Sequence, residues 1–113
     1  MKKITHKILR NYKDASGKIP FLDWLNSLKD PNIRLRVRRR LDRLEVGNFG
    51  DCKSVGEGVF ELRLAFGSGY RIYFAEHDDT IIILLCGGDK GTQVKDIKKA
   101  KIYWIELKER SDE

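Results

Sequence analysis

VFELRLAFGSGYRIYFAEHDDTIIILLC, residues 59–86, is the stretch that decides the fold. Apolar and polar residues alternate through much of its first half, which is the period of a β-strand with one covered face. Gly67-Ser68-Gly69 interrupts the alternation where a hairpin can turn, and residues 77–80 form a second turn. Residues 81–86 are apolar throughout, which is typical of a central strand covered on both faces. The stretch therefore predicts three consecutive antiparallel strands.

The alternation also predicts a register for the first hairpin. A three-residue turn would pair the apolar residues of one face as follows: Phe66 with Tyr70, Leu64 with Ile72, and Leu62 with Phe74. The other face would carry Arg63 opposite Tyr73, with Arg71 diagonal to them. Two guanidinium groups and a phenol on one face can clamp a phosphate and stack on a base.

The flanking segments add a strand and three helices. Ile4–Tyr12 alternates weakly and predicts a first strand, and a helix begins at Pro20. A second helix follows Asp30-Pro31-Asn32 and stops at Gly47, and a last helix runs from about Gln93 to Lys108 with Thr92 as its N-cap. The apolar stripes of the three helices are Phe21, Leu22, Leu25 and Leu28; Ile33, Val37, Leu41 and Leu44; and Ile97, Ala100, Trp104 and Leu107.

This order of elements predicts an α+β fold, a small, mainly antiparallel sheet with an N-terminal helical hairpin and a C-terminal helix. We expect the first two helices to form an antiparallel hairpin because only about two residues join them. The 113 residues contain no repeat and no Ser/Pro-rich linker, which indicates a single domain over residues 1–113.

Composition indicates the class of partner. The chain has 23 Lys and Arg against 17 Asp and Glu, a net charge of +6, which suits a polyanion because neutralised phosphates release counterions. Cys52 and Cys86 are too few for a disulfide framework and lack zinc-site spacing. No signal peptide is visible, and the longest apolar run, residues 81–86, is too short to cross a bilayer. We therefore expect a cytoplasmic protein that does not contact a membrane.

The second helix carries six arginines within ten positions, namely Arg34, Arg36, Arg38, Arg39, Arg40 and Arg43. Only Asp42 and Glu45 offset them, so ion pairs within the helix cannot absorb most of this charge. Three interpretations stay open: a solvated face, a surface that contacts phosphates, and a docking surface for an acidic partner.

Chemistry in this chain would have to come from Arg, Lys and Tyr. His6 and His77 lie on a terminal strand and a turn, and no cluster of carboxylates predicts a magnesium site. The glycine-rich residues 87–91 lack the Walker spacing, so we do not expect nucleotide binding. We expect no metal and no cofactor. The candidate catalytic residues are Arg71, Arg63, Lys90, Lys53 and Tyr73.

The ordered motifs resemble the RelE/HigB/ParE toxin superfamily, and more narrowly its phage-derived, HigB-like addiction-module killer proteins. The motifs are Phe60-Glu61-Leu62-Arg63, Gly69-Tyr70-Arg71-Ile72-Tyr73-Phe74, residues 84–90 (LLCGGDK), and Gln93 with Asp96-Ile97 and Ala100. The resemblance covers the chain from Ile19 to the last helix.

The resemblance implies a microbial RNase-like fold and a metal-free, ribosome-dependent mRNA endonuclease, the toxin of a type II toxin–antitoxin system. A ribose 2′-hydroxyl would attack the adjacent phosphodiester and leave a 2′,3′-cyclic phosphate. Arg71 falls on the position whose guanidinium stabilises charge on phosphate, Lys90 on the basic residue after the central strand, and Lys53 in the loop that supplies a general-base lysine. Gly91 and Ile97 depart from the pattern, since they replace an arginine and a tyrosine of RelE. The histidine pair of some HigB proteins is also absent.

The resemblance also implies the partners: a helix-turn-helix antitoxin, the ribosome and mRNA, and operator DNA only through the antitoxin. In this reading Arg36, Arg39, Arg40 and Arg43 bind ribosomal RNA. Two alternatives have the same fold. One is a ParE-like inhibitor of DNA gyrase, and the other is a catalytically degenerate co-repressor that acts with its antitoxin.

Overall fold

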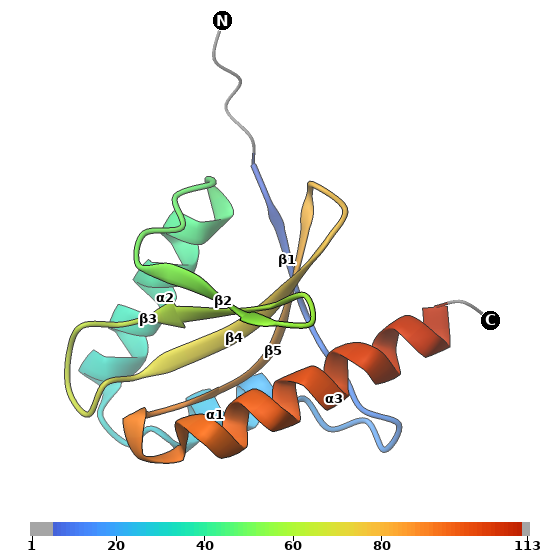
Figure 1. Ribbon diagram of the computed structural model, residues 1–113. Helices are drawn as coiled ribbons and strands as arrows, with labels where there is room; N and C mark the ends of the chain where they lie inside the picture. Colours follow the sequence, from blue (N-terminus) through green and yellow to red (C-terminus); the bar gives the residue numbers. More distant parts are fainter. Residues whose placement is uncertain (1–5, 112–113) are drawn as a thin grey trace, which may run out of the picture.

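The computed structural model describes residues 6–111. Five strands form one mixed sheet in the order β1-β5-β4-β3-β2, in which β1 runs parallel to β5 and the other neighbours are antiparallel (Figure 1). The strands are β1 (Ile8–Asn11), β2 (Cys52–Gly56), β3 (Val59–Arg63), β4 (Arg71–His77) and β5 (Ile81–Gly88). The helices are α1 (Pro20–Ser27), α2 (Pro31–Glu45), the short 3-10 helix η1 (Lys90–Thr92) and α3 (Gln93–Ser111).

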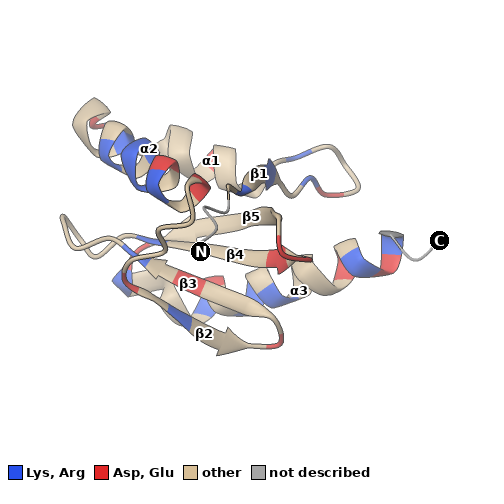
Figure 2. Ribbon diagram, turned by 90° about the horizontal axis from the view of Figure 1, so that it is seen from above, with Lys and Arg blue, Asp and Glu red and all other residues tan. Residues whose placement is uncertain are grey.

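The sheet lies between two helical layers. Viewed along its edge, α1 and α2 lie on one side and α3 lies on the other (Figure 2). On the first side Leu62, Ile72 and Phe74 pack with residues of α1 and α2. On the second side Tyr73 and Ala75 pack with α3, whose Trp104 is 7% exposed. Each face of the sheet therefore has its own apolar core, as the uninterrupted apolar run of β5 requires.

The predicted central strand is confirmed. β5 lies between β1 and β4, and Ile82, Leu84 and Leu85 are buried. The apolar stripe of α3 is confirmed at Ala100 and Trp104, which pack against the sheet. Within residues 6–111, no helix is both long and apolar enough to span a membrane.

The predicted register of the β3–β4 hairpin is wrong by two residues. Leu62 pairs with Ile72, and Arg63 pairs directly with Arg71. The turn is longer than predicted because Leu64 N–H donates to Tyr70 O, and Phe66 lies in the loop with its ring 5.8 Å from that of Tyr70. A slip by two leaves every side chain on its predicted face.

The predicted N-terminal helical hairpin is not evident. Each helix turns its apolar residues to the sheet: Phe21 and Leu25 of α1, and Val37 and Leu44 of α2, all belong to one core with β3, β4 and β5. The sheet offers a wider apolar face than a second helix would, so both stripes are buried against it. The backbone at Leu28 is extended, which separates the two helices.

Three further predictions change at their boundaries. The first strand is Ile8–Asn11, and the predicted residues 4 and 5 lie outside those described. Asp89, not Thr92, is the cap at the start of the C-terminal helical segment, because η1 precedes α3 and the Asp89 carboxylate accepts from Gly91 N–H and Thr92 N–H.

Lys53, predicted to lie in a loop, lies in β2. That strand was missed because its pairing is shifted between Ser54 and Gly56, which disrupts the alternation.

Replacing Gly87 by alanine is expected to destabilise the fold. A Cβ atom at Gly87 would lie 2.2 Å from a ring carbon of Trp24 in α1, so the indole or the strand would have to move. Overpacking of this kind typically costs about 1–3 kcal/mol in the free energy of unfolding, which urea denaturation measures. Gly91→Ala is the control, because its Cβ would meet only the Asp89 carboxylate, at 3.2 Å. Equal stability of Gly87→Ala and the wild type would contradict this packing.

Candidate functional site

A buried carboxylate organises the predicted site. Glu61 projects from β3 toward α3 and is fully buried. Its Oε1 accepts a hydrogen bond from Arg63 Nε at 3.0 Å, and its Oε2 accepts from Tyr73 OH at 3.0 Å and Gln93 Nε2 at 2.8 Å. Donors from β3, β4 and the start of α3 thus converge on one acidic group, and they hold these three elements in a fixed relation.

Three cations surround this carboxylate. Besides Arg63, Arg71 Nε lies 3.4 Å from Glu61 Oε2, and Lys53 Nζ lies 3.9 Å from Oε1. The Arg71 Nε contact is an ion pair that lacks hydrogen-bond geometry, since this buried atom has no hydrogen-bond partner. The side chains of Lys53 and Arg63 are 51% and 38% exposed, whereas that of Arg71 is 11% exposed. The site therefore presents more positive charge than Glu61 neutralises.

Lys90 is placed beside Arg71 by a close approach of two loops. Lys90 N–H donates to Ser68 O at 3.4 Å, which joins the start of η1 to the β3–β4 turn. Gly69 lies between the two side chains, since a Cβ there would be 3.3 Å from Arg71 Nη1 and 3.4 Å from Lys90 Cβ. Gly69 has φ +77 and its carbonyl accepts from Arg71 Nη1 at 2.7 Å, so this glycine both turns the chain and orients the guanidinium.

Tyr73 is in the site but not at its surface. Its side chain is fully buried, and burial together with the neighbouring Glu61 raises the pKa of the phenol well above its ordinary value. Burial would also raise the pKa of Glu61, but hydrogen bonds from Arg63, Gln93 and Tyr73 outweigh it, and the pKa of Glu61 is lowered. Glu61 is therefore ionised at neutral pH and Tyr73 is a neutral donor to it.

The α2 arginines divide into exposed and buried residues. Arg positions recur along the α2 ribbon (blue in Figure 2), and Arg36, Arg39 and Arg43 are exposed. Arg36 lies over the Phe66 ring, with its Cζ 4.6 Å from the ring centroid. Arg40 is 6% exposed and donates from Nη2 to Phe49 O at 2.6 Å. Sequence periodicity did not predict the burial of Arg40, because the pattern assigns every arginine of the helix to its polar, exposed face.

Other groups with chemical potential contribute little. Cys52 and Cys86 are free thiols, and burial raises the pKa of Cys86 to about 12, so that thiol stays protonated. Among residues 6–111 no three His, Cys, Asp or Glu side chains gather as ligands for a metal ion. Lys53, Arg63 and Arg71 around Glu61, together with Lys90 beside Arg71, form a cluster that can bind an anionic oxygen and offset charge that develops on it.

Sequence reasoning predicted the four cations but missed Glu61 and Gln93. Glu61 had a usable signal, because it is the one carboxylate on the strand face that carries Arg63. Gln93 belongs to the last of the quoted motifs, but no local pattern links it to Glu61, which lies 32 residues away in the chain.

The site lies in a region shared with known proteins. Residues 23–107 match the family described as phage-derived protein Gp49-like. The chain belongs to the Gp49-like family. It is also similar to an uncharacterized protein of Haemophilus influenzae, with 49% identity over 89 residues that cover 79% of this chain and 90% of the relative.

The arginine-rich α2 and the cations around Glu61 both belong to the Gp49-like region. The matched residues 23–107 include all of α2, the buried carboxylate of Glu61 and every cation around it. β1 and α1 up to Leu22 precede the match, although α1 completes the core beneath β5.

Proposed function

We propose that this Gp49-like protein is the toxin of a toxin–antitoxin pair and cleaves mRNA on the ribosome. The observation that carries the proposal is the cluster of Lys53, Arg63, Arg71 and Lys90 around the buried Glu61. Cationic side chains held in a fixed geometry stabilise the charge of a phosphoryl transition state without rearranging during the reaction. Membership of a phage-derived family and the net charge of +6 agree with a cellular polyanion as the target.

In this proposal a ribose 2′-oxygen attacks the adjacent phosphorus, and the bond from phosphorus to the 5′-oxygen breaks. Lys53, in its neutral amine form, accepts the proton of the 2′-hydroxyl, and Arg71 with Arg63 offsets the charge on the phosphate oxygens. Lys90, exposed beside Arg71, donates a proton to the departing 5′-oxygen. The products are a 2′,3′-cyclic phosphate and a 5′-hydroxyl.

Tyr73 and Glu61 have positioning roles in this scheme. Tyr73 is fully buried and its hydroxyl is committed to Glu61, so it acts through the carboxylate instead of contacting RNA. Glu61 holds the Arg63 side chain by a hydrogen bond and the Arg71 side chain by an ion pair. The two guanidinium groups are thereby oriented before substrate arrives, which lowers the cost of ordering them in the transition state.

We propose that α2 is the surface through which the protein binds RNA on the ribosome, and that a helix-turn-helix antitoxin inhibits by covering the cluster around Glu61. The exposed Arg36, Arg39 and Arg43 supply the phosphate contacts. Trp104 packs in the core under α3, so the antitoxin would contact α3 through other residues. Operator DNA would be bound by the antitoxin.

Induced expression in growing bacteria, followed by primer extension on abundant transcripts, tests the proposal. We expect growth arrest and new 5′ ends inside translated regions, which disappear when translation initiation is blocked. An SOS response without cleavage would instead indicate inhibition of DNA gyrase. Normal growth with stable protein would leave only a co-repressor role, and either result would overturn the nuclease proposal.

A further inference from the structure

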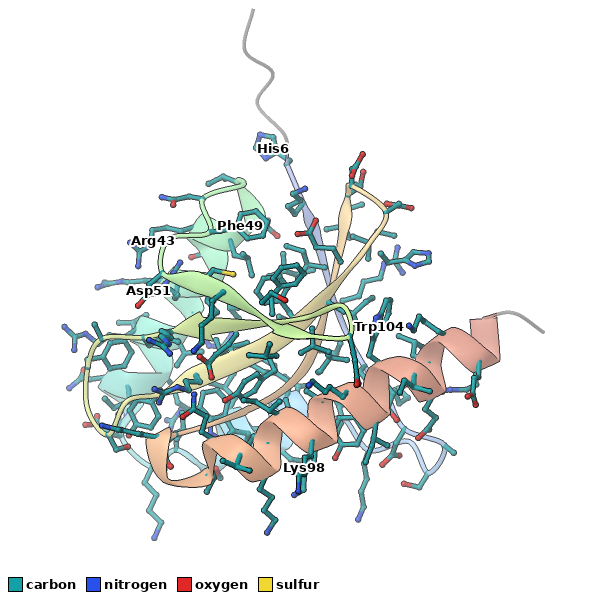
Figure 3. All side chains as sticks on the ribbon, viewed as in Figure 1. His6, Arg43, Phe49, Asp51, Lys98 and Trp104 are labelled. Carbon is teal, nitrogen blue, oxygen red and sulfur yellow. The ribbon has the colours of Figure 1, made fainter. Side chains whose placement is uncertain are left out.

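Two adjoining grooves run between α2 and the end of β3. The larger, of about 540 Å³, is lined by Arg36, Arg39, Arg40, Asp42, Arg43 and Phe66. The smaller, of about 320 Å³, shares Arg40, Arg43 and Phe66 with it and continues to Arg63 at the cluster around Glu61. Arg43 and Asp51, which both line the smaller groove, are labelled in Figure 3. The grooves therefore connect α2 to the candidate site.

Arg40 is an unpaired buried cation in the wall of both grooves. It is 94% buried, its Nη2 donates to Phe49 O, and its Nη1 has no hydrogen-bond partner. Burial lowers the pKa of the guanidinium, and the neighbouring Arg43 lowers it further. Proteins rarely bury a charged donor without an acceptor, because neither water nor protein then replaces its lost hydration. An anion in the groove would supply the compensating charge.

Gly50 leaves room for this guanidinium. A Cβ at Gly50 would lie 2.5 Å from Arg40 Nη2 and 3.1 Å from Nη1, and the residue has φ +58. Gly50 itself lines the smaller groove together with Arg40. Any larger residue would displace Arg40.

The remaining lining residues favour a nucleotide. Arginines outnumber carboxylates in the two grooves, where Asp42 and Asp51 are the acidic residues. The Phe66 ring carries the Arg36 guanidinium at 4.6 Å, and an unpaired base can extend such a stack on the outer face of a guanidinium plane. A paired base in a duplex cannot do so, which favours a single strand.

We propose that these grooves bind one nucleotide of single-stranded RNA, next along the strand from the nucleotide that reacts at Arg71. Arg40 and Arg43 hold its phosphate, and its base stacks on Arg36 over Phe66. The subsite rests on the proposed RNA-cleaving function, since it places the message strand relative to the reacting phosphate.

Binding of a 2′-O-methyl RNA oligonucleotide to the full chain tests the subsite, because the methyl group blocks attack and no cleavage is needed. Fluorescence anisotropy over a salt series gives the affinity and its salt slope. Arg43→Gln should reduce the slope by about 0.7, the value for one lost contact to a single strand. Phe66→Leu should weaken binding about 2- to 5-fold, because the Arg36 guanidinium on which the base stacks loses the ring that supports it. Arg40→Gln and Gly50→Ala probe the buried cation, with circular dichroism to check folding.

Arg38→Gln is the matched control, because Arg38 is exposed on the same helix and lines neither groove. We expect it to leave the slope unchanged. Equal effects of Arg38→Gln and Arg43→Gln would overturn the subsite, and so would equal affinity for a duplex of the same sequence. These outcomes are separate from the proposed function. If the protein cleaves mRNA but Arg38→Gln and Arg43→Gln change oligonucleotide binding equally, only the subsite is overturned. If the variants change binding as predicted but the protein does not cleave mRNA, only the nuclease proposal is overturned.

Discussion

Arg71→Ala is expected to reduce cleavage of ribosome-bound mRNA by about 100- to 1000-fold, which is the typical cost of removing one donor to a transition-state oxyanion. Arg71 is the most enclosed of the cations around Glu61, and its Nη1 is fixed by Gly69 O at 2.7 Å. A guanidinium held in this way needs no further ordering when charge develops on phosphate. The measurement is the single-turnover rate on programmed ribosomes, together with growth after induction.

The variant should still fold. Glu61 keeps three hydrogen bonds, from Arg63, Tyr73 and Gln93, because Arg71 contributes only an ion pair at 3.4 Å. Arg71→Lys should restore part of the rate, since it keeps the charge but loses the planar fork. Arg38→Ala is the control for removal of a surface arginine and should cleave normally. A folded Arg71→Ala protein with the wild-type rate would remove Arg71 from the mechanism.

Glu61→Gln is expected to have the largest effect on stability. The substitution keeps the shape of the side chain but leaves Arg63, Arg71 and Lys53 near one another without a counter-charge. Removal of one partner from a buried ion pair typically costs about 3–5 kcal/mol in the free energy of unfolding. Urea denaturation measures the loss, and Glu109→Gln, at an exposed position, should stay within about 0.5 kcal/mol of the wild type. If Glu61→Gln unfolds at the same urea concentration as the wild type, the ion pairs of Glu61 do not stabilise the fold.

The pH dependence of the Glu61 contribution has a defined sign. The pKa of Glu61 in the folded protein is lowered from its ordinary 4.5, so the unfolded chain binds a proton there first as pH falls. The stabilisation is complete above about pH 4.5 and is lost as pH falls through the lowered pKa of the folded protein. The difference in unfolding free energy between wild type and Glu61→Gln should therefore narrow below about pH 4.5. A difference that stays constant down to the acid transition would contradict this assignment.

Local periodicity was sufficient for much of the fold. Alternation in residues 59–76 predicted the β3–β4 hairpin and the shared face of Arg63 and Arg71, and the apolar run of 81–86 predicted the central β5. These predictions survive even the two-residue error in register, because a side chain changes face only when a strand slips by an odd number of residues.

The chain by itself thus determined which side of a strand each residue faces, and the tertiary structure decided what covers that side. α3 covers the face that carries Tyr73 and Glu61, so a predicted surface phenol becomes a buried donor, and Glu61, a motif residue without a predicted role, becomes the acceptor at the centre of the cluster. Gln93 reaches Glu61 only because the 3-10 turn after β5 brings the start of α3 back to the sheet. Arg40 is buried because Phe49 and Gly50, in the segment between α2 and β2, lie against its guanidinium. Such contacts join residues far apart in sequence, and sequence periodicity records only which residues share a face.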